Sequence, residues 1–140
     1  MPQYTSSHIK FQEKYVIVIV KPCTKKGLET ILPILRNHNE LALAGTLANL
    51  ADVNRKLGNY DTAFNIGCEG LELAMKMKKR YTIAWISLVL AKVETERGNY
   101  KSALSHAKQA LEFYEKAGLY FEVIEEAKIL IKGLQEKVSK

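Results

Sequence analysis

Apolar residues recur at spacings of three and four along most of the chain, which predicts amphipathic helices rather than strands. Between residues 81 and 97 this spacing connects Ala84, Leu88 and Ala91. Four more segments share it: 41–57, 60–78, 100–117 and 120–137. A glycine follows the last turn of several of them, and glycine readily takes the positive φ that ends a helix. The expected fold class is therefore all-α.

The chain repeats itself at an offset of forty residues. Gly58-Asn59-Tyr60 recurs as Gly98-Asn99-Tyr100, and Asn99 is expected to cap the helix that follows it. The same offset relates Ala44, Leu50, Ala51, Val53, Ala63, Leu71, Glu72 and Lys76 to Ala84, Leu90, Ala91, Val93, Ala103, Leu111, Glu112 and Lys116. This offset defines two full units, 41–80 and 81–120, and each unit is expected to form a pair of helices. Short links make neighbouring helices antiparallel, so we expect stacked helical hairpins with a capping helix over 120–138.

The repeated residues resemble the tetratricopeptide repeat family. The resemblance lies in Leu50-Ala51, Gly58-Asn59-Tyr60, Ala63 and Gly70-Leu71, and in Leu90-Ala91, Gly98-Asn99-Tyr100, Ala103 and Ala110-Leu111. The family period is about 34 residues, and the longer period here is similar to the extended repeats of kinesin light chains and bacterial peptide-sensing regulators. The resemblance implies a right-handed superhelical array over 25–140 that acts as a protein–protein interaction module or adaptor, without catalytic activity.

The N-terminal segment, 1–24, does not match the repeat. Residues 16–20 are a run of Val and Ile, which favours a strand, whereas the repeat predicts a helix there, and both remain open. A strand needs a partner, so residues 14–20 are a candidate site of homo-oligomerisation. Leu28 to His38 resembles the second helix of a degenerate repeat, in which Pro33 is expected to kink the helix or delay its start.

The length and the net charge of the chain limit the classes of protein to which it can belong. The 140 residues suit one domain, and the net charge of +6 is concentrated in the N-terminal half, which suits an acidic partner. The longest wholly apolar run, 15–20, is too short to span a membrane, and no secretory leader is visible, so no membrane partner is expected. Cys23 and Cys68 form no disulfide framework, which predicts a cytoplasmic protein.

No arrangement of residues predicts catalysis or a cofactor. His8, His38 and His106 are scattered and lack further residues at metal-ligand spacing, so no metal site is expected. Gly67 and Gly70 lie within a predicted helix and are interpreted as helix-packing residues. The cations of 76–80 are interpreted as favourable to the helix dipole, with an anchor for an acidic peptide or a phosphate as the alternative. We therefore expect a protein that is not an enzyme.

The candidate binding residues come from the resemblance, because in this family the first helices of the hairpins line a concave groove. They are Asn49, Asp52, Lys56, Trp85, Leu88, Val89, Lys92, Lys128 and Lys132. Trp85 and Leu88 are expected to anchor a protein or peptide, with an acidic group oriented by lysines, and packing between repeats is the alternative role for Trp85. A nucleic-acid-associated helical array is the less favoured alternative function, since only the positive charge supports it.

Overall fold

The computed structural model describes residues 25–38, 40–118 and 121–140, and every regular element in these ranges is an α-helix. The helices are α1 (Lys25–His38), α2 (Glu40–Lys56), α3 (Tyr60–Met77), α4 (Arg80–Glu96), α5 (Tyr100–Ala117) and α6 (Phe121–Val138). The all-α prediction is confirmed. The segment 1–24, including the candidate oligomerisation residues 14–20, lies outside the described residues.

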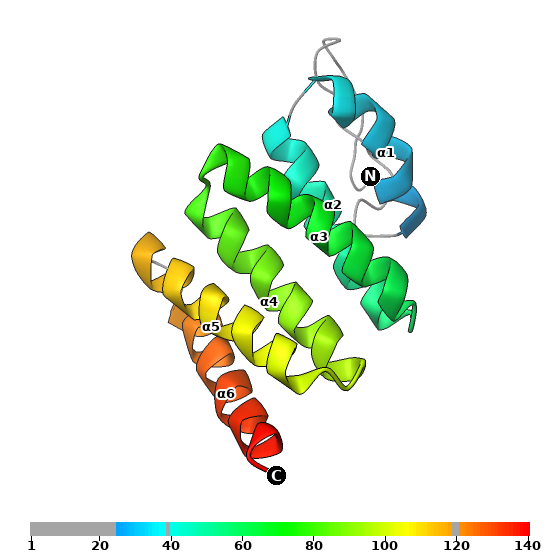
Figure 1. Ribbon diagram of the computed structural model, residues 1–140. Coiled ribbons are helices and arrows are strands. Elements are labelled where there is room, and N and C mark those ends of the chain that lie inside the picture. Colours follow the sequence, from blue (N-terminus) through cyan, green and yellow to red (C-terminus); the bar gives the residue numbers. More distant parts are fainter. Residues whose placement is uncertain (1–24, 39, 119–120) are drawn as a thin grey trace, which may run out of the picture.

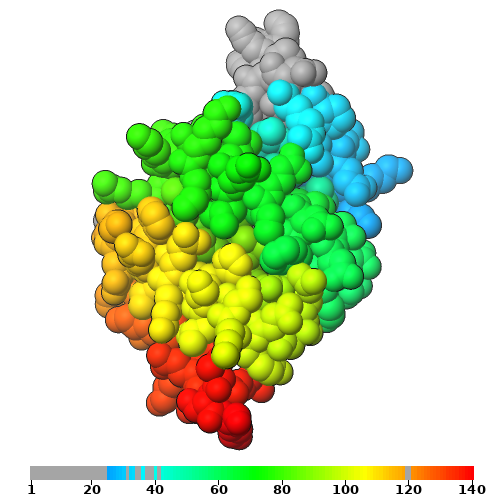
Figure 2. Space-filling model, in the orientation of Figure 1, coloured from blue at the N-terminus to red at the C-terminus, as the bar shows by residue number. Residues whose placement is uncertain are grey.

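The six helices form a stack of antiparallel hairpins, as predicted. Each helix packs on the next one, and α2 also packs on α4, so the first helices of the two full hairpins are neighbours. In Figure 1, α3 and α5 lie in front, and α2 and α6 lie behind them. Side chains of α3 (green) and α5 (yellow) cover much of the face seen in Figure 2. The array therefore has an outer layer, which includes α3 and α5, and an inner layer made of α2, α4 and α6.

Pro33 does not delay the start of α1. The helix begins at Lys25 and contains Pro33 in its interior, so this part of the prediction is wrong. Proline removes one backbone hydrogen bond and leaves the carbonyl of the residue four positions earlier without its helical donor. Pro33 is exposed, so that carbonyl can be hydrated on the outer side of α1.

The core is centred on α4, the helix that contacts α2, α3 and α5. Ile86 and Leu90 are fully buried, and they pack with Ala44 and Ala48 of α2. The predicted crossing residue Ala63 packs on Ala51 with no exposed surface. The same contact recurs between Ala103 and Ala91 in the next hairpin, which confirms that small residues let the paired helices approach closely.

The turns confirm the predicted helix ends and correct the predicted caps. Gly58, Gly98 and Gly118 all have φ near +85° (85°, 85° and 84°), where glycine carries little strain. Asn59 and Asn99 occupy the N-cap positions of α3 and α5, but neither side chain makes a capping hydrogen bond. Their side-chain N–H groups donate instead to a buried oxygen of the preceding helix, and this orientation does not present the side-chain oxygen to the helix N–H groups that it would cap.

Candidate partner-binding surface

The inner layer carries one stripe of residues on each of its three helices. On α2 the stripe is Gly45, Asn49, Asp52 and Lys56, at spacings of three and four that place them on one face. Trp85 of α4 lies next to it, because a Cβ built on Gly45 would stand 4.0 Å from Cζ3 of the indole. We call the half-buried and exposed members of these stripes the inner surface: Gly45, Asn49, Asp52, Lys56, Trp85, Lys92, Glu96, Glu126, Ile129 and Gly133.

Trp85 is partly packed and partly accessible. Its indole contacts two core clusters, one around Ile86 and Leu90 and another around Val93. Its remaining surface borders the ring of Tyr81, whose centroid lies 6.2 Å away at an interplanar angle of 30°. The expected packing role and the expected surface role of Trp85 therefore coexist in one side chain.

Leu88 and Val89 lie beside Trp85 but contribute no comparable surface. They are 3% and 4% exposed. Leu88 packs on Tyr114 and Ala127, and Val89 packs on the hairpin before it. The apolar surface that the sequence suggested for them is already used in packing, because α4 is covered by helices on opposite sides.

The helical glycines fall into two kinds. A Cβ at Gly67 would stand 2.7 Å from Cδ2 of Leu90, and one at Gly70 would stand 3.2 Å from Cβ of Leu47, so a larger residue at either position would crowd buried side chains. A Cβ at Gly45 would make only an ordinary contact, and one at Gly133 would meet nothing within 4 Å. Both glycines that packing does not require lie on the inner surface.

An ion-pair network links α2 to α4 along this surface. Arg55 donates to Asp52 at 3.0 Å within α2 and to Glu96 of α4 at 2.9 Å. Burial of Arg55 disfavours its charged form, but the hydrogen bonds to Glu96 and Asp52 outweigh that cost and raise its pKa. Lys56 pairs with the second oxygen of Asp52 at 3.3 Å and keeps two thirds of its side chain exposed (66%).

The junction of α4 and α6 carries a second ion pair, between Lys92 and Glu126 at 2.5 Å. Glu126 therefore marks the side of α6 that faces the inner surface. At about 100° per residue, Lys128 lies about 160° and Lys132 about 120° around the helix from Glu126. The structure thus places Lys92 on the inner surface and does not bring Lys128 and Lys132 to it.

The displacement of these lysines has a simple cause, because the register of α6 departs from the forty-residue offset by one position. Lys78 and Gly118 are the left-handed residues that end α3 and α5, and they stand forty positions apart. The following helices start at Arg80 and Phe121, forty-one positions apart.

The buried residues follow the longer offset. The counterparts of the buried residues Ile86 and Val93 are Ala127 and Leu134, which are 0% and 1% exposed. A shift of one position turns a helix by about 100°, which is enough to exchange one face for another.

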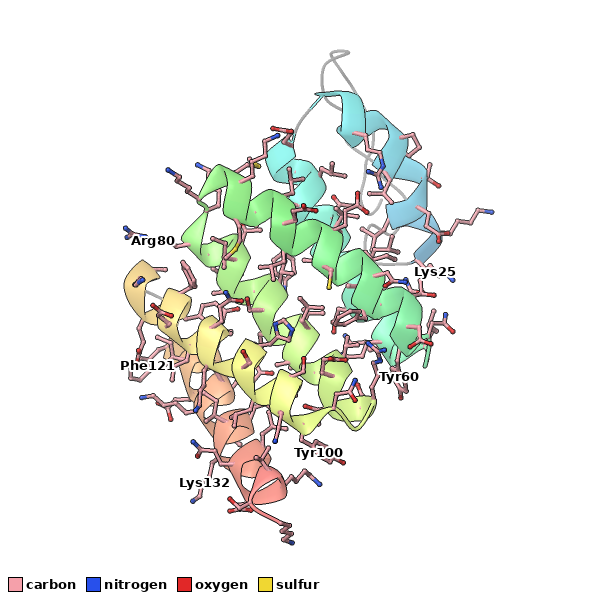
Figure 3. All side chains as sticks on the ribbon, in the orientation of Figure 1. Lys25, Tyr60, Arg80, Tyr100, Phe121 and Lys132 are labelled. Carbon is pink, nitrogen blue, oxygen red and sulfur yellow. The ribbon has the colours of Figure 1, made fainter. Side chains whose placement is uncertain are left out.

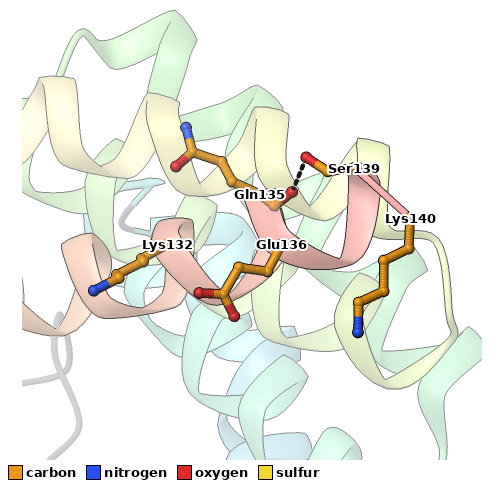
Figure 4. Close-up of a pocket in the computed structure, with 5 residues that line it drawn as sticks. All are labelled: Lys132, Gln135, Glu136, Ser139 and Lys140. Carbon is orange, nitrogen blue, oxygen red and sulfur yellow. Dashed lines mark hydrogen bonds between the residues drawn. The ribbon is translucent and has the colours of Figure 1, made fainter.

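Lys132 instead borders a hollow of ≈ 470 Å³ on the outer side of α6. Within the described part of the chain its lining comes from the end of α6 and the two residues after it: Lys132, Gln135, Glu136, Ser139 and Lys140 (Figure 4). The Ser139 hydroxyl donates to the Gln135 carbonyl at 2.8 Å. Lys128 pairs with Glu125 of its own helix at 3.6 Å. This side of α6 is a solvated end of the array.

Buried polar groups close the turns of both hairpins. Glu94 is 4% exposed and accepts hydrogen bonds from Arg97 at 3.0 Å and from Asn99 at 3.3 Å. Asn54, the equivalent residue forty positions earlier, accepts from Asn59 at 3.3 Å. Sequence analysis missed this pair, although the signal was present as two polar residues on otherwise apolar stripes.

The titratable groups near Glu94 show no sign of nucleophilic or metal chemistry. Burial raises the pKa of the Cys68 thiol, which keeps it in its less reactive protonated form. Burial also lowers the pKa of His106. Among residues 25–38, 40–118 and 121–140, no three His, Cys, Asp or Glu side chains gather in a way that suits a metal ion.

A comparison with models of protein families identifies the class of protein that has this arrangement of helices. A model of the tetratricopeptide repeat matches residues 42–116, more than half of the chain. The protein therefore belongs to the tetratricopeptide repeat family, whose domains are protein–protein interaction modules and are typically non-catalytic scaffolds. A search of curated proteins found no match. Within the described residues, no helix is both long and apolar enough to cross a membrane.

Proposed function

We propose that the protein is an adaptor-type module that holds a peptide segment of a partner protein against the inner surface. The observation that supports this most directly is the position of Gly45 and Gly133. A glycine inside a helix costs about 1 kcal/mol relative to alanine, and packing gives no reason for either one. Glycine on an open helix face allows another backbone to approach closely.

Trp85 supplies the apolar contact for such a peptide. Tryptophan is enriched at binding hot spots, where its loss can weaken binding by 2 kcal/mol or more. The side chain is held by two core clusters, so its orientation is already set before a partner arrives. Gly45, one unit earlier, leaves the indole uncovered on that side.

Charges on both sides of Trp85 favour a polar peptide in a defined direction. The Arg55–Glu96 pair lies at the junction of α2 and α4, and the Lys92–Glu126 pair lies at the junction of α4 and α6. Asn49 and Asp52 line the α2 side, and Lys56 adds an exposed cation. Preformed ion pairs across helices lower the ordering cost of binding. An acidic group on the peptide is expected near Lys56 and Lys92.

The experiment uses peptides selected from a random display library on the wild-type protein. Their binding is measured by the fluorescence of Trp85, the single tryptophan of the chain. Gly45→Leu covers the indole without a backbone clash and is expected to weaken binding at least tenfold. The matched control Asn65→Leu adds the same side chain at an exposed position on α3. Equal binding by both variants would refute the proposed site.

Salt dependence separates this function from the nucleic-acid alternative. A duplex-DNA ligand loses affinity with a slope of about 0.9 in log K per log salt for each phosphate contact. A peptide anchored on Trp85 is expected to show a shallower slope, since it carries no phosphate backbone and its acidic group meets only Lys56 and Lys92. A steep slope with duplex DNA, together with no peptide selected above background, would favour the alternative.

A further inference from the structure

One edge of the array concentrates unpaired positive charge. Here α3 ends, α4 begins, α5 ends and α6 begins (Figure 1). The end of α3, the turn after it and the start of α4 carry four cations within five positions, Lys76, Lys78, Lys79 and Arg80, which we call the basic edge. Figure 3 shows the side chain of Arg80 extending away from the ribbon at this edge.

Little within the described residues neutralises the basic edge. Lys76 reaches Glu40 at 3.5 Å, with both side chains more than half exposed, and no ion pair forms at Lys78, Lys79 or Arg80. The first turn of α4 has no acidic residue, whereas α2, α3 and α6 each have one. At the end of α5, Glu112 is already paired with Lys116 at 3.1 Å.

Lys78 occupies a backbone position at which glycine is favoured. Lys78 has φ 55° and ψ 40°, in the left-handed region, and it is the only non-glycine residue of the described chain with positive φ. Its counterpart at the end of α5 is Gly118, with φ 84°. A left-handed conformation is unfavourable for a residue with a Cβ. A charge kept at the expense of stability points to a role outside folding.

Exposed aromatic side chains lie at the same edge. Phe121 is 75% exposed, the highest value among the large hydrophobic residues described, and Tyr81 is 40% exposed. The Tyr81 ring meets Tyr114 edge-on at 6.0 Å. Tyr114 packs with Val123 at the start of α6, within one turn of Phe121. The Tyr81 ring therefore reaches the side chains where α5 ends and α6 begins, and Figure 3 labels Phe121 on the same side of the array as Arg80.

We propose that this edge docks on a membrane surface rich in anionic phospholipids, with the basic edge over the headgroups and Phe121 and Tyr81 at the boundary with the acyl chains. Cations beside amphipathic rings are the combination that binds such an interface. These side chains project from the ends of helices and do not line a groove, so a broad anionic surface suits them better than a narrow peptide. Docking of this kind needs no membrane-spanning helix.

The test is flotation of the full chain with vesicles of phosphatidylcholine alone or with 30% phosphatidylserine, in about 0.1 M salt. Binding is expected only with phosphatidylserine. Each cation near such a surface contributes about fivefold in affinity, so the triple variant Lys78→Gln, Lys79→Gln and Arg80→Gln is expected to bind about 100-fold more weakly. Phe121→Ser is expected to weaken binding about tenfold.

The matched control removes the same charge elsewhere, with Lys101→Gln, Lys108→Gln and Lys140→Gln, all at exposed positions. It is expected to keep at least a fifth of the wild-type affinity. Circular dichroism checks that every variant remains helical. No binding to phosphatidylserine vesicles, equal losses in both triple variants, or binding to polyglutamate without vesicle binding would each overturn the proposal.

Discussion

Replacing Gly67 by alanine tests the packing argument most sharply, because two opposing effects have different sizes. Alanine is better than glycine inside a helix by about 1 kcal/mol. The new Cβ, however, would stand 2.7 Å from Cδ2 and 3.2 Å from Cγ of Leu90. Leu90 has no exposed surface and packs in the core with Ile86, so its side chain can move only against other buried side chains.

The cost of overpacking a filled core is about 1–3 kcal/mol, which equals or exceeds the gain in helix propensity. Gly67→Ala is therefore expected to be neutral or to destabilise by up to about 2 kcal/mol. The matched variant is Gly133→Ala, also within a helix, where the new Cβ meets nothing within 4 Å. It is expected to stabilise by about 0.5–1 kcal/mol.

Chemical denaturation monitored by circular dichroism measures the free energy of unfolding of both variants, and thermal melting ranks their stabilities independently. At about 3–6 °C per kcal/mol for a chain of this size, Gly133→Ala is expected to melt several degrees above Gly67→Ala. If Gly67→Ala is as stable as Gly133→Ala, the contact with Leu90 does not constrain α3, and the division of the glycines into two kinds fails.

Three further outcomes are expected. Lys78→Gly relieves the left-handed strain and should raise the free energy of unfolding by about 0.5–1 kcal/mol in urea titration, whereas Gly118→Ala should lower it. Leu134→Ala removes a fully buried contact that holds α6 on α5, and it should cost about 2–5 kcal/mol, with hydrogen exchange in α6 accelerated most. Burial lowers the pKa of His106, so the folded state binds fewer protons than the unfolded state. The contribution of neutral His106 to stability should therefore be complete above pH 6.5 and should decline as the pH falls toward the lower pKa of the folded state. His106→Gln should flatten this decline in thermal melts between pH 5 and 7.5.

The sequence alone was sufficient to predict the helices of the two full units. The forty-residue offset predicted the helices that became α2 to α5, and the positive φ of Gly58 and Gly98 agrees with the predicted ends. These features are local, since they depend on apolar spacing and on the conformational freedom of glycine. These features could therefore be predicted from the sequence without knowledge of which helices pack together.

The surface was harder to predict because it depends on tertiary contacts. The offset of forty does not hold for α6, whose buried residues follow an offset of forty-one, and Lys128 and Lys132 therefore lie away from Lys92. Similarly, only the position of α4 between other helices explains why Leu88 and Val89 are buried while Trp85 is not. The N-cap position of Asn99 was predicted correctly, but its side chain does not cap the helix, because the amide donates to the buried carboxylate of Glu94 across the turn.

Chemical-shift mapping of a bound peptide tests the central claim, partner binding on the inner surface, most directly. A library-selected peptide is titrated into the isotope-labelled protein, and amide shifts are followed together with the indole N–H of Trp85. The account predicts that the largest changes fall at Gly45, Asn49, Trp85, Lys92 and Gly133, on α2, α4 and α6. Changes confined to the exposed faces of α3 and α5, with the Trp85 indole signal unmoved at saturation, would contradict it.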